Sequence, residues 1–448
     1  MLSPVHRLNR PSADQGRYSK VLSVLSRLSG ITVDVSPLRK FPAFRFFLAG
    51  QSIGWFGKHM RVVALGWQIY SITGSSVAVG MLGLTEVVPL IAFSSFAGTL
   101  ADTHDRKRIM RWSQAAQVAV SLALAILTIS GSPPLLAIYA LSAMAAASDA
   151  FDGPVRVAIV PSLVDWDGIA PAFALRQILM QISQIIGPAL GGILIGAFSV
   201  AAVYLVDAAL FMVSIFTLGF VPSLVPAQTK HVSRLDAIKE GLRFALGQRL
   251  LRSLFLVDLA AMVFGMPRAL FPELAVDVFG IGASGVGLLY AAPAAGAFLG
   301  AMLSGWVNGV SRQGIAIFVS VGVWGIAVTA AGLALPHLIL TLILLSAAGA
   351  ADVFSAVFRV TLLQQSTPDG LRGRVTSVST MATVGGPPLG DVEAGTAAAL
   401  IGLRGSIVFG GLACLAITAM IGWRYPELRR FRRGDDPGSG RTNPRKDG

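Results

Sequence analysis

The sequence predicts an all-α membrane protein with twelve transmembrane helices, arranged as two parallel six-helix pseudo-repeats. Of its 448 residues, 54% are hydrophobic and 13% are charged, and the mean hydropathy is +0.69. Soluble proteins carry about 25% charged residues. Apolar runs long enough to cross a bilayer, about 20 residues each, recur along the whole chain. Two motifs also recur at nearly the same offset, which indicates a duplicated unit.

The apolar segments are separated by short polar links. The predicted spans are 43–72, 76–101, 108–131, 134–160, 170–197, 200–221, 252–278, 284–308, 314–335, 338–362, 376–402 and 405–424. The longer link 222–251 divides the chain into a first bundle, 41–221, and a second bundle, 252–424. Basic tails, 1–40 and 425–448, flank the bundles.

The formal net charge of +13 is concentrated in the two tails and in the middle linker. With an even number of spans, these three segments share one face of the membrane. Lys and Arg in short loops mark the cytoplasmic face, so both termini are expected in the cytoplasm. The charge pattern therefore favours topology and contact with anionic lipid over binding of nucleic acid.

The two halves repeat in sequence. Asp149-Ala-Phe-Asp-Gly-Pro-Val-Arg156 is echoed by Asp352-Val-Phe-Ser-Ala-Val-Phe-Arg359, and Gly187-Pro-Ala-Leu-Gly191 is echoed by Gly386-Pro-Pro-Leu-Gly390. The offsets are 203 and 199 residues, or about six helices. Parallel repeats of this kind place a binding site between the halves, near the bilayer midplane.

A charged loop joins the second and third predicted spans: Gly98-Thr-Leu-Ala-Asp102-Thr-His-Asp-Arg106-Lys-Arg108. On charge alone it is equally well a basic loop that obeys the positive-inside rule. Its pattern resembles the Gly-x-Leu-Ala-Asp-x-x-Gly-Arg-Lys-Arg loop between helices 2 and 3 of the major facilitator superfamily, with Asp105 in place of the usual glycine.

Further motifs, Phe151-x-Gly-Pro-x-Arg156 and Leu371-Arg-Gly-Arg-Val375, resemble the bacterial secretion-effector branch, which includes enterobactin exporters and macrolide efflux pumps. The resemblance covers roughly residues 36–425. It implies a transporter of the bacterial inner membrane that works by alternating access and exports a siderophore, antibiotic or related small molecule in exchange for protons. Facilitated diffusion, or uptake of a polar metabolite by proton symport, stays open as an alternative.

The resemblance also assigns roles to two groups of residues. A cytoplasmic gate is expected from Gly98, Asp102 and Arg106. By spacing alone, Arg156 and Arg359, each two turns after its acid, and Asp152, four residues before Arg156, are expected to be gate or anchor residues. A helix-packing face resembling the "antiporter motif" of facilitator exporters, with Ser183 in place of its first glycine, is formed by Ser183, Gly187, Pro188, Gly191 and Gly192. Small residues at this spacing let two helices approach closely.

Polar residues at membrane depth are costly, so each needs a role. Gln51, Lys58, Arg61 and Gln68 share one face of the first span, with Trp55 nearby. Together with Arg268, these residues are candidates to line a cavity or bind substrate. A stripe of this kind either faces water or pairs with acids on neighbouring helices. The family more often has an acid at the position of Lys58.

The intramembrane acids Glu86, Asp149, Asp352, Asp391 and Glu393 are candidates for proton coupling, with Glu86 and Asp149 ranked first. A carboxyl group away from water readily exists in its neutral form and can carry a proton. The alternative is that each acid neutralises a base such as Lys58, Arg61 or Arg268. Asp207 and Asp258 are expected to be structural.

Enzymatic interpretations find no support. No nucleotide-binding Gly motif or His-Glu-x-x-His motif occurs, so neither a cofactor nor a metal is expected. The single cysteine, Cys414, excludes an internal disulfide. The expected partners are a small-molecule substrate, protons and the lipid bilayer, and the expected state is a monomer. The bases of the first span suit an anion and the excess acids suit a cation, so the charge of the substrate stays open.

Overall fold

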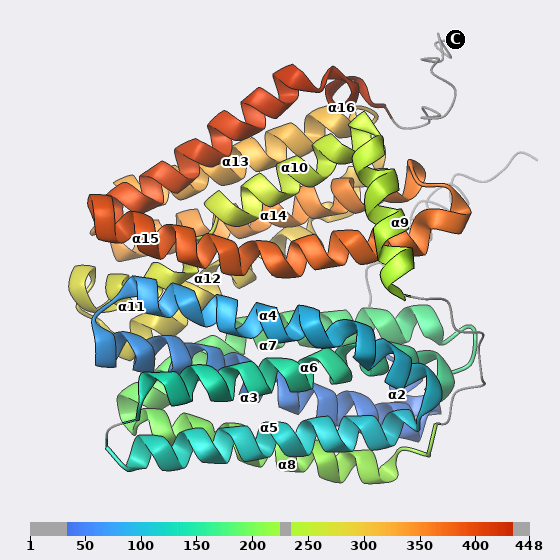
Figure 1. The fold of residues 1–448 in the computed structure, drawn as a ribbon, viewed down its shortest axis with the longest axis vertical. Helices are drawn as coiled ribbons and strands as arrows, with labels where there is room; N and C mark the ends of the chain where they lie inside the picture. The colour runs from blue at the N-terminus through green and yellow to red at the C-terminus, as the bar shows by residue number, and fades with distance from the viewer. Residues whose placement is uncertain (1–33, 132, 225–233, 433–448) are drawn as a thin grey trace, which may run out of the picture.

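The computed structural model describes residues 34–131, 133–224 and 234–432, and the regular structure of these residues is entirely helical. In Figure 1 the helices run roughly parallel in two groups, one above the other. The linker helix and the two ends of the described chain lie on the right, here called the linker end. The turns between α3 and α4, between α5 and α6 and between α13 and α14 lie on the opposite side, here called the far end.

The first group of helices packs α3 against α7 and α8, α4 against α6, and α5 against α6 and α8. Its elements are α2 (Ser36–Lys40), α3 (Pro42–Thr73), α4 (Ser76–Thr103), α5 (Arg106–Ile129), α6 (Leu135–Leu163), α7 (Ile169–Ala197), α8 (Val200–Thr217) and η1 (Leu218–Phe220).

The second group packs α12 against α14, α13 against α14 and α15, and α10 against α15. Its elements are α10 (Arg249–Phe264), η2 (Arg268–Leu270), α11 (Phe271–Glu273), η3 (Leu274–Val278), α12 (Gly282–Met302), η4 (Ser304–Gly309), α13 (Gln313–Leu333), α14 (Leu338–Gln365), α15 (Asp369–Arg424) and α16 (Pro426–Arg430). The linker helix α9 (Arg234–Gly247) lies against α15.

The helix boundaries follow the apolar segments closely, with two informative breaks. The predicted span 252–278 is not one helix, because α10 ends at Phe264 and short helical turns follow. Pro267 has no N–H to donate and cannot continue an α-helix. Helix α15 is interrupted at Gly402, where φ is 77° and ψ is 164°. That break falls between the predicted spans 376–402 and 405–424.

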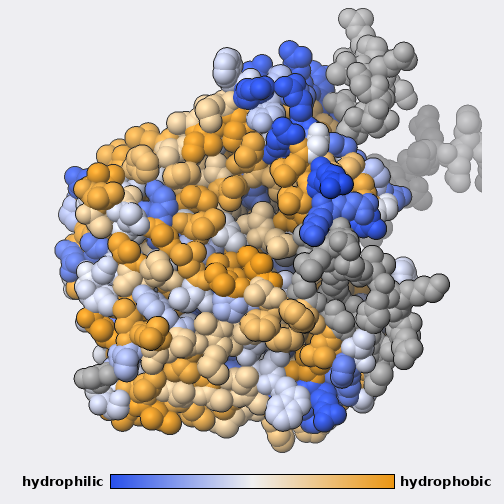
Figure 2. Space-filling model, in the orientation of Figure 1, coloured by the Kyte–Doolittle hydropathy of each residue, from blue (hydrophilic) through white to orange (hydrophobic). Residues whose placement is uncertain are grey.

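Ten helices in the described part of the chain are long and apolar enough to cross a membrane. This number counts the broken segment Arg249–Val278 as one span and α15 as another, and α3, which carries Arg45, Lys58 and Arg61, is not among the ten. Figure 2 shows apolar side chains covering the flanks of the helices and polar side chains gathering toward their two ends. Leu136, Leu400 and Trp423 each expose about 80% of their surface. Such a surface belongs against lipid, so the chain is a multi-pass membrane protein.

The two groups meet along two helix pairs, α4 with α15 and α7 with α12. Glycines make these contacts close at the far end. A Cβ atom added at Gly192 would lie 2.6 Å from the backbone oxygen of Ala283, and one added at Gly80 would lie 2.4 Å from the backbone oxygen of Asp391. Only residues without a side chain fit at such distances.

Hydrogen bonds between the two groups are found at the same end. The Tyr70 hydroxyl donates to Asp277 at 2.6 Å, and the Ser76 hydroxyl donates to Glu273. Among the described residues these are the hydrogen bonds that join the two groups directly. The far end is therefore closed by both backbone packing and polar contacts.

Candidate functional site

A cavity of about 530 Å³ lies between the two groups of helices. Its wall takes residues from α3, α4, α5, α6 and α7 on one side and from η2 and α15 on the other. The charged residues on this wall are Lys58, Arg61, Glu86, Asp149 and Arg268. A central cavity with so many charged groups is the candidate site.

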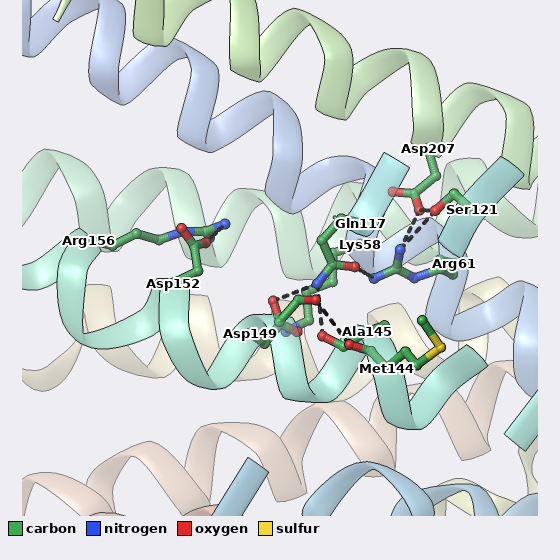
Figure 3. Close-up of polar contacts among 11 residues, drawn as sticks. Lys58, Arg61, Gln117, Ser121, Met144, Ala145, Asp149, Asp152, Arg156 and Asp207 are labelled. Atoms are coloured by element: carbon green, nitrogen blue, oxygen red, sulfur yellow. Dashed lines mark hydrogen bonds and ion pairs between the residues drawn. The ribbon is translucent and has the colours of Figure 1, made fainter. Parts of the chain in front are cut away.

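The first part of the site is an ion pair between α3 and α6. Lys58 Nζ lies 2.7 Å from Asp149 Oδ2. The Gln117 side-chain amide of α5 donates to Asp149 Oδ1 at 3.1 Å, and its oxygen accepts from Arg61 Nη2 at 2.6 Å. Gln117 thus links Arg61 to the ion pair of Lys58 and Asp149, and Figure 3 shows these side chains as one network.

The second part of the network is more deeply buried. Arg61 Nη1 lies 2.8 Å from Asp207 Oδ2 of α8, and Ser121 of α5 bonds to both side chains. Arg61 is 4% exposed and Asp207 is fully buried. The guanidinium also lies 5.7 Å from the ring centre of Phe211. Two bases and two acids from three helices, α3, α6 and α8, thus balance one another, as a buried charge requires.

The opposite wall carries one more ion pair. Arg268 Nη2 of η2 lies 2.7 Å from Asp391 Oδ2 of α15. Glu86 of α4 is within electrostatic reach of Lys58, Arg61 and Arg268, yet it makes no hydrogen bond or ion pair with any described residue. Of the charged residues on the cavity wall, Glu86 alone lacks a partner within the described part of the chain.

The comparisons with known proteins decide the family. Residues 32–442 match the family model described as transmembrane secretion effector. The chain belongs to this family of major facilitator transporters. The family consists of transporters and not enzymes, and none of the described residues form a group of three His, Cys, Asp or Glu able to hold a metal ion.

The curated relatives of this secretion effector include enterobactin exporters. The enterobactin exporter EntS of Citrobacter koseri is 27% identical over 400 residues, which cover 89% of this chain and 96% of the relative. Its counterpart from Shigella boydii is 28% identical over the same coverage. The match spans nearly the full length of both proteins, so it includes both groups of helices.

Solved structures of low identity share the fold. A bacterial homologue of the human lysosomal transporter Spinster, in an inward-facing and unoccupied conformation, superposes with a TM-score of 0.69 at 14% identity. That match covers 86% of this chain and 98% of the other. The nucleoside transporter NupG gives a TM-score of 0.70 at 10% identity, with 86% and 99% covered. These likenesses show that the secretion effector has the major facilitator fold.

The ends of the predicted polar stripe on α3 do not reach the cavity. Gln51 accepts a hydrogen bond from Arg176 Nε at 3.3 Å, and the same guanidinium lies 5.2 Å from the ring centre of Trp55. Gln68 donates to the Thr128 hydroxyl at 2.8 Å. These three residues are buried in the first group of helices, and only the middle of the stripe faces the cavity.

The predicted gate residues are distributed over several contacts. Gly98 and Asp102 lie in the last turns of α4, but their surroundings are outside the part that the structure describes. Arg106 Nη1, at the start of α5, donates to the backbone oxygen of Ala158 in α6 at 2.9 Å. Asp152 and Arg156 form an ion pair within α6 and are both buried. Arg106 thus fastens the loop that carries the family motif to α6.

Asp105, which the sequence marked only as a departure from the family pattern, caps the N-terminus of α5. Its carboxylate accepts from the Lys107 amide at 3.0 Å, from the Ser223 hydroxyl at 2.6 Å and from the Leu224 amide at 3.1 Å. Burial acts to raise the pKa of Asp105, but these hydrogen bonds outweigh it and hold the pKa below its ordinary value. Asp105 therefore connects the loop between α4 and α5 to the start of the linker.

The remaining acids occupy different environments. Arg359 of α14 pairs with Asp258 of α10 at 2.9 Å and lies 3.6 Å from Asp352. The sequence could not identify Arg359 as the partner of Asp258, because the two residues lie 101 positions apart and on different helices. Glu393 of α15 does not line the central cavity and has no hydrogen-bond or ion-pair partner among the described residues.

The small-residue motif of α7 lies where three helices meet. A Cβ atom added at Gly187 or Gly191 would lie 2.7 Å or 3.0 Å from atoms of α3. Gly192 instead faces α12 in the other group of helices. Ser183 and Pro188 are buried between them. The motif therefore packs the first group together and also forms part of its contact with the second.

Proposed function

We propose that this secretion effector exports a small molecule from the cytoplasm of a bacterium across the inner membrane, driven by inward proton flow and by alternating access. The observation that carries the proposal is the central cavity, where neutral ion pairs surround one unpaired carboxylate, Glu86. A carboxylate of this kind can exchange a proton for a substrate group while the paired charges stay in place.

The proposal includes a topology of twelve membrane passes in two repeats. Helices α3 to α8 supply six of them. The second six are the broken segment from α10 to η3, then α12, α13, α14 and the two parts of α15 on either side of Gly402. Basic residues are frequent in the linker and tails, so the linker end is cytoplasmic. Because the two groups complete the cavity between them, one chain is sufficient and we expect a monomer.

In this orientation the closed far end faces away from the cytoplasm, and the structure represents an inward-facing state. Glu86 then gives its proton to cytoplasmic water and the cavity takes up substrate. After the halves rock, the cavity faces outward, the substrate leaves and Glu86 takes a proton from outside. Each inward charge contributes about 2.3 kcal/mol per 100 mV of membrane potential.

The relatives suggest where to look for the substrate. Curated proteins similar to this chain are named as enterobactin exporters, and the match covers 89% of the chain. We therefore propose a siderophore, antibiotic or related metabolite as the substrate class, with enterobactin as the first probe.

The test is proton movement in proteoliposomes on addition of enterobactin. Wild type is compared with Glu86→Gln and with the matched control Asp369→Asn, an exposed acid at the linker end, 89% exposed. Support is proton flux that follows the substrate, disappears in Glu86→Gln and persists in the control. Enterobactin movement down its own gradient, independent of pH and unchanged in Glu86→Gln, would overturn proton coupling.

A further inference from the structure

The ion pairs of the two groups of helices differ in charge balance. In the first group, each of the three buried acids Asp149, Asp152 and Asp207 has its own base. In the second group, Arg359 faces two acids at once, Asp258 and Asp352. The second group therefore has one carboxylate more than its nearby base can neutralise.

The carboxylates of Asp258 and Asp352 approach the same guanidinium nitrogen of Arg359. Arg359 Nη2 lies 2.9 Å from Asp258 Oδ1 and 3.6 Å from Asp352 Oδ1, while Nη1 donates to the Ser355 hydroxyl at 2.8 Å. The side chains of Arg359 and Asp258 are each 8% exposed, and that of Asp352 is 31% exposed. We call Asp258, Arg359 and Asp352 the α10–α14 cluster.

The repeated motif explains how the imbalance arises. In the first copy, Asp152 neutralises Arg156 four residues later on the same helix. At the matching place in the second copy the residue is Ser355, which is neutral. Arg359 consequently takes Asp258 of α10 as its partner, and the repeated acid Asp352 is left sharing the same base.

No other described charge compensates the cluster. The helices packed on α14 are α12, α13 and η4, and none of the three carries a charged residue. On α15, the residue facing Asp258 is Thr383, and the acid Asp391 is held by Arg268. Two carboxylates on one base leave a net negative charge among apolar helices, which costs several kcal/mol unless one carboxylate takes up a proton.

At the linker end of α10 the charges are engaged elsewhere. Arg249 pairs with Glu427 of α16, and Glu240 of α9 pairs with Arg374. Arg252 of α10 donates to the backbone oxygen of Leu246, and Arg372 of α15 pairs with Asp369. Among the described residues, no ion pair therefore joins the α10–α14 cluster to a basic residue at the linker end.

The cluster has a route to the central cavity. A smaller cavity of about 130 Å³ is lined by Asp258, Arg359 and Thr383. Thr383 also lines the central cavity, so this residue lies between the two spaces. Water in the central cavity can thus exchange a proton with the cluster through the hydroxyl of Thr383.

We propose that the α10–α14 cluster holds one exchangeable proton, shared by Asp258 and Asp352, and is a second proton site of the transport cycle. The inference rests on the proposed proton-coupled function. The proton comes from water on the outer side and returns to cytoplasmic water, and Arg359 stays positively charged throughout. Loss of the proton gives Asp352 of α14 a full negative charge. The attraction of Arg359 to Asp352 then competes with its attraction to Asp258 of α10, so the position of the guanidinium differs between the two states.

Infrared difference spectroscopy of the purified, reconstituted protein tests the proposal, because a protonated carboxyl group has its own C=O stretching band. A titration from acidic to alkaline pH should show loss of this band in wild type. Asp352→Asn and Asp258→Asn should each lack the cluster's part of the band, since either change leaves one acid with one base. The control Glu86→Gln, which changes the unpaired acid of the central cavity, should keep it.

Thr383→Val adds a readout that does not depend on removing a charge. It should slow hydrogen–deuterium exchange of the cluster's band at least several-fold and leave the band's amplitude unchanged. An unchanged band in both Asp352→Asn and Asp258→Asn would overturn the proposal. The failure of the proposed function is a separate result: enterobactin transport without proton flux, in a protein that retains the band, removes proton coupling and leaves the proton site in place.

Discussion

Substitution of Gly192 by alanine tests whether contact at the far end controls the conformational state. Gly192 lies on α7 and faces α12 across the boundary between the two groups of helices. An alanine Cβ atom there would lie 2.6 Å from the backbone oxygen of Ala283 and 3.1 Å from backbone atoms of Gly287. Backbone atoms cannot rotate out of the way as a flexible side chain can, so the two helices must separate.

The size of the effect follows from this distance. Ordinary contacts of a Cβ atom begin near 3.4 Å, so the helices must move apart by roughly 0.8 Å. Overpacking of this kind typically costs about 1–3 kcal/mol. The cost falls on the state closed at the far end and is relieved when that end opens. The ratio of far-end-open to far-end-closed molecules should therefore rise about 5- to 150-fold.

The assay is a distance distribution between spin labels on Phe198→Cys and His337→Cys, one in each group and both exposed at the far end. Cys414 is fully buried and does not compete for label. Gly322→Ala is the matched control, because a Cβ atom at Gly322 would meet no atom within 4 Å. Gly192→Ala should add a longer distance. An unchanged distribution, or the same change in the control, would refute the reasoning.

Three further predictions concern charged residues. Asp207→Ala alone should lower the free energy of unfolding by about 3–5 kcal/mol, measured by denaturant unfolding in micelles. The double variant Arg61→Met with Asp207→Leu should recover most of this loss. If the losses of the two single changes simply add up in the double variant, the buried pair is contradicted. Lys58→Met should lower transport about tenfold by leaving Asp149 unpaired, and Lys58→Arg should retain most of it; equal loss in both would mean that charge is not the relevant property. The pKa of Asp105 is lowered in the folded state, so its hydrogen bonds contribute stability above about pH 4, and this stability is lost as the pH falls through the folded-state pKa. In wild type, amide hydrogen exchange of Leu224, corrected for intrinsic rates, should therefore accelerate in acid. In Asp105→Asn it should be fast at every pH. Exchange in Asp105→Asn that matches wild type at neutral pH would argue against this connection.

The sequence predicted the helical architecture well, because apolar runs and their breaks are local properties. The predicted span 76–101 corresponds to α4, and the predicted boundary near 402 corresponds to the break at Gly402. The interruption after Phe264 was missed, although Gly265 and Pro267 were visible signals. The apolar run continues through them, and hydropathy alone does not register a missing backbone donor.

The site was only partly predictable. Spacing along one helix placed Lys58 and Arg61 on one face of α3 and left open whether they line a cavity or pair with acids; in the structure they do both. It could not say which acid each base would meet, since Asp149 lies 91 positions from Lys58 and Asp207 lies 146 positions from Arg61. Those partners are fixed by how α3, α6 and α8 pack. Pairing also separates Asp149, which has a base, from Glu86, which has none, although the sequence had ranked the two together.

The distribution of polar contacts suits a protein whose halves move as units. Every ion pair at membrane depth among the described residues lies within one group of helices, such as Arg61 with Asp207 in the first and Arg268 with Asp391 in the second. Rocking of one group on the other therefore breaks no buried ion pair, which would cost about 3–5 kcal/mol.

The polar contacts that opening must break are instead the two hydrogen bonds at the far end. Tyr70 with Asp277, and Ser76 with Glu273, each join a hydroxyl to a carboxylate. Hydrogen bonds to charged groups contribute about 1.5–3 kcal/mol each, and water at the opened end replaces them. The part of the closing energy that comes from these hydrogen bonds is thus small enough for one proton moving down a membrane potential to offset much of it. Coupling does not require any rearrangement of the charged network around Lys58 and Arg61.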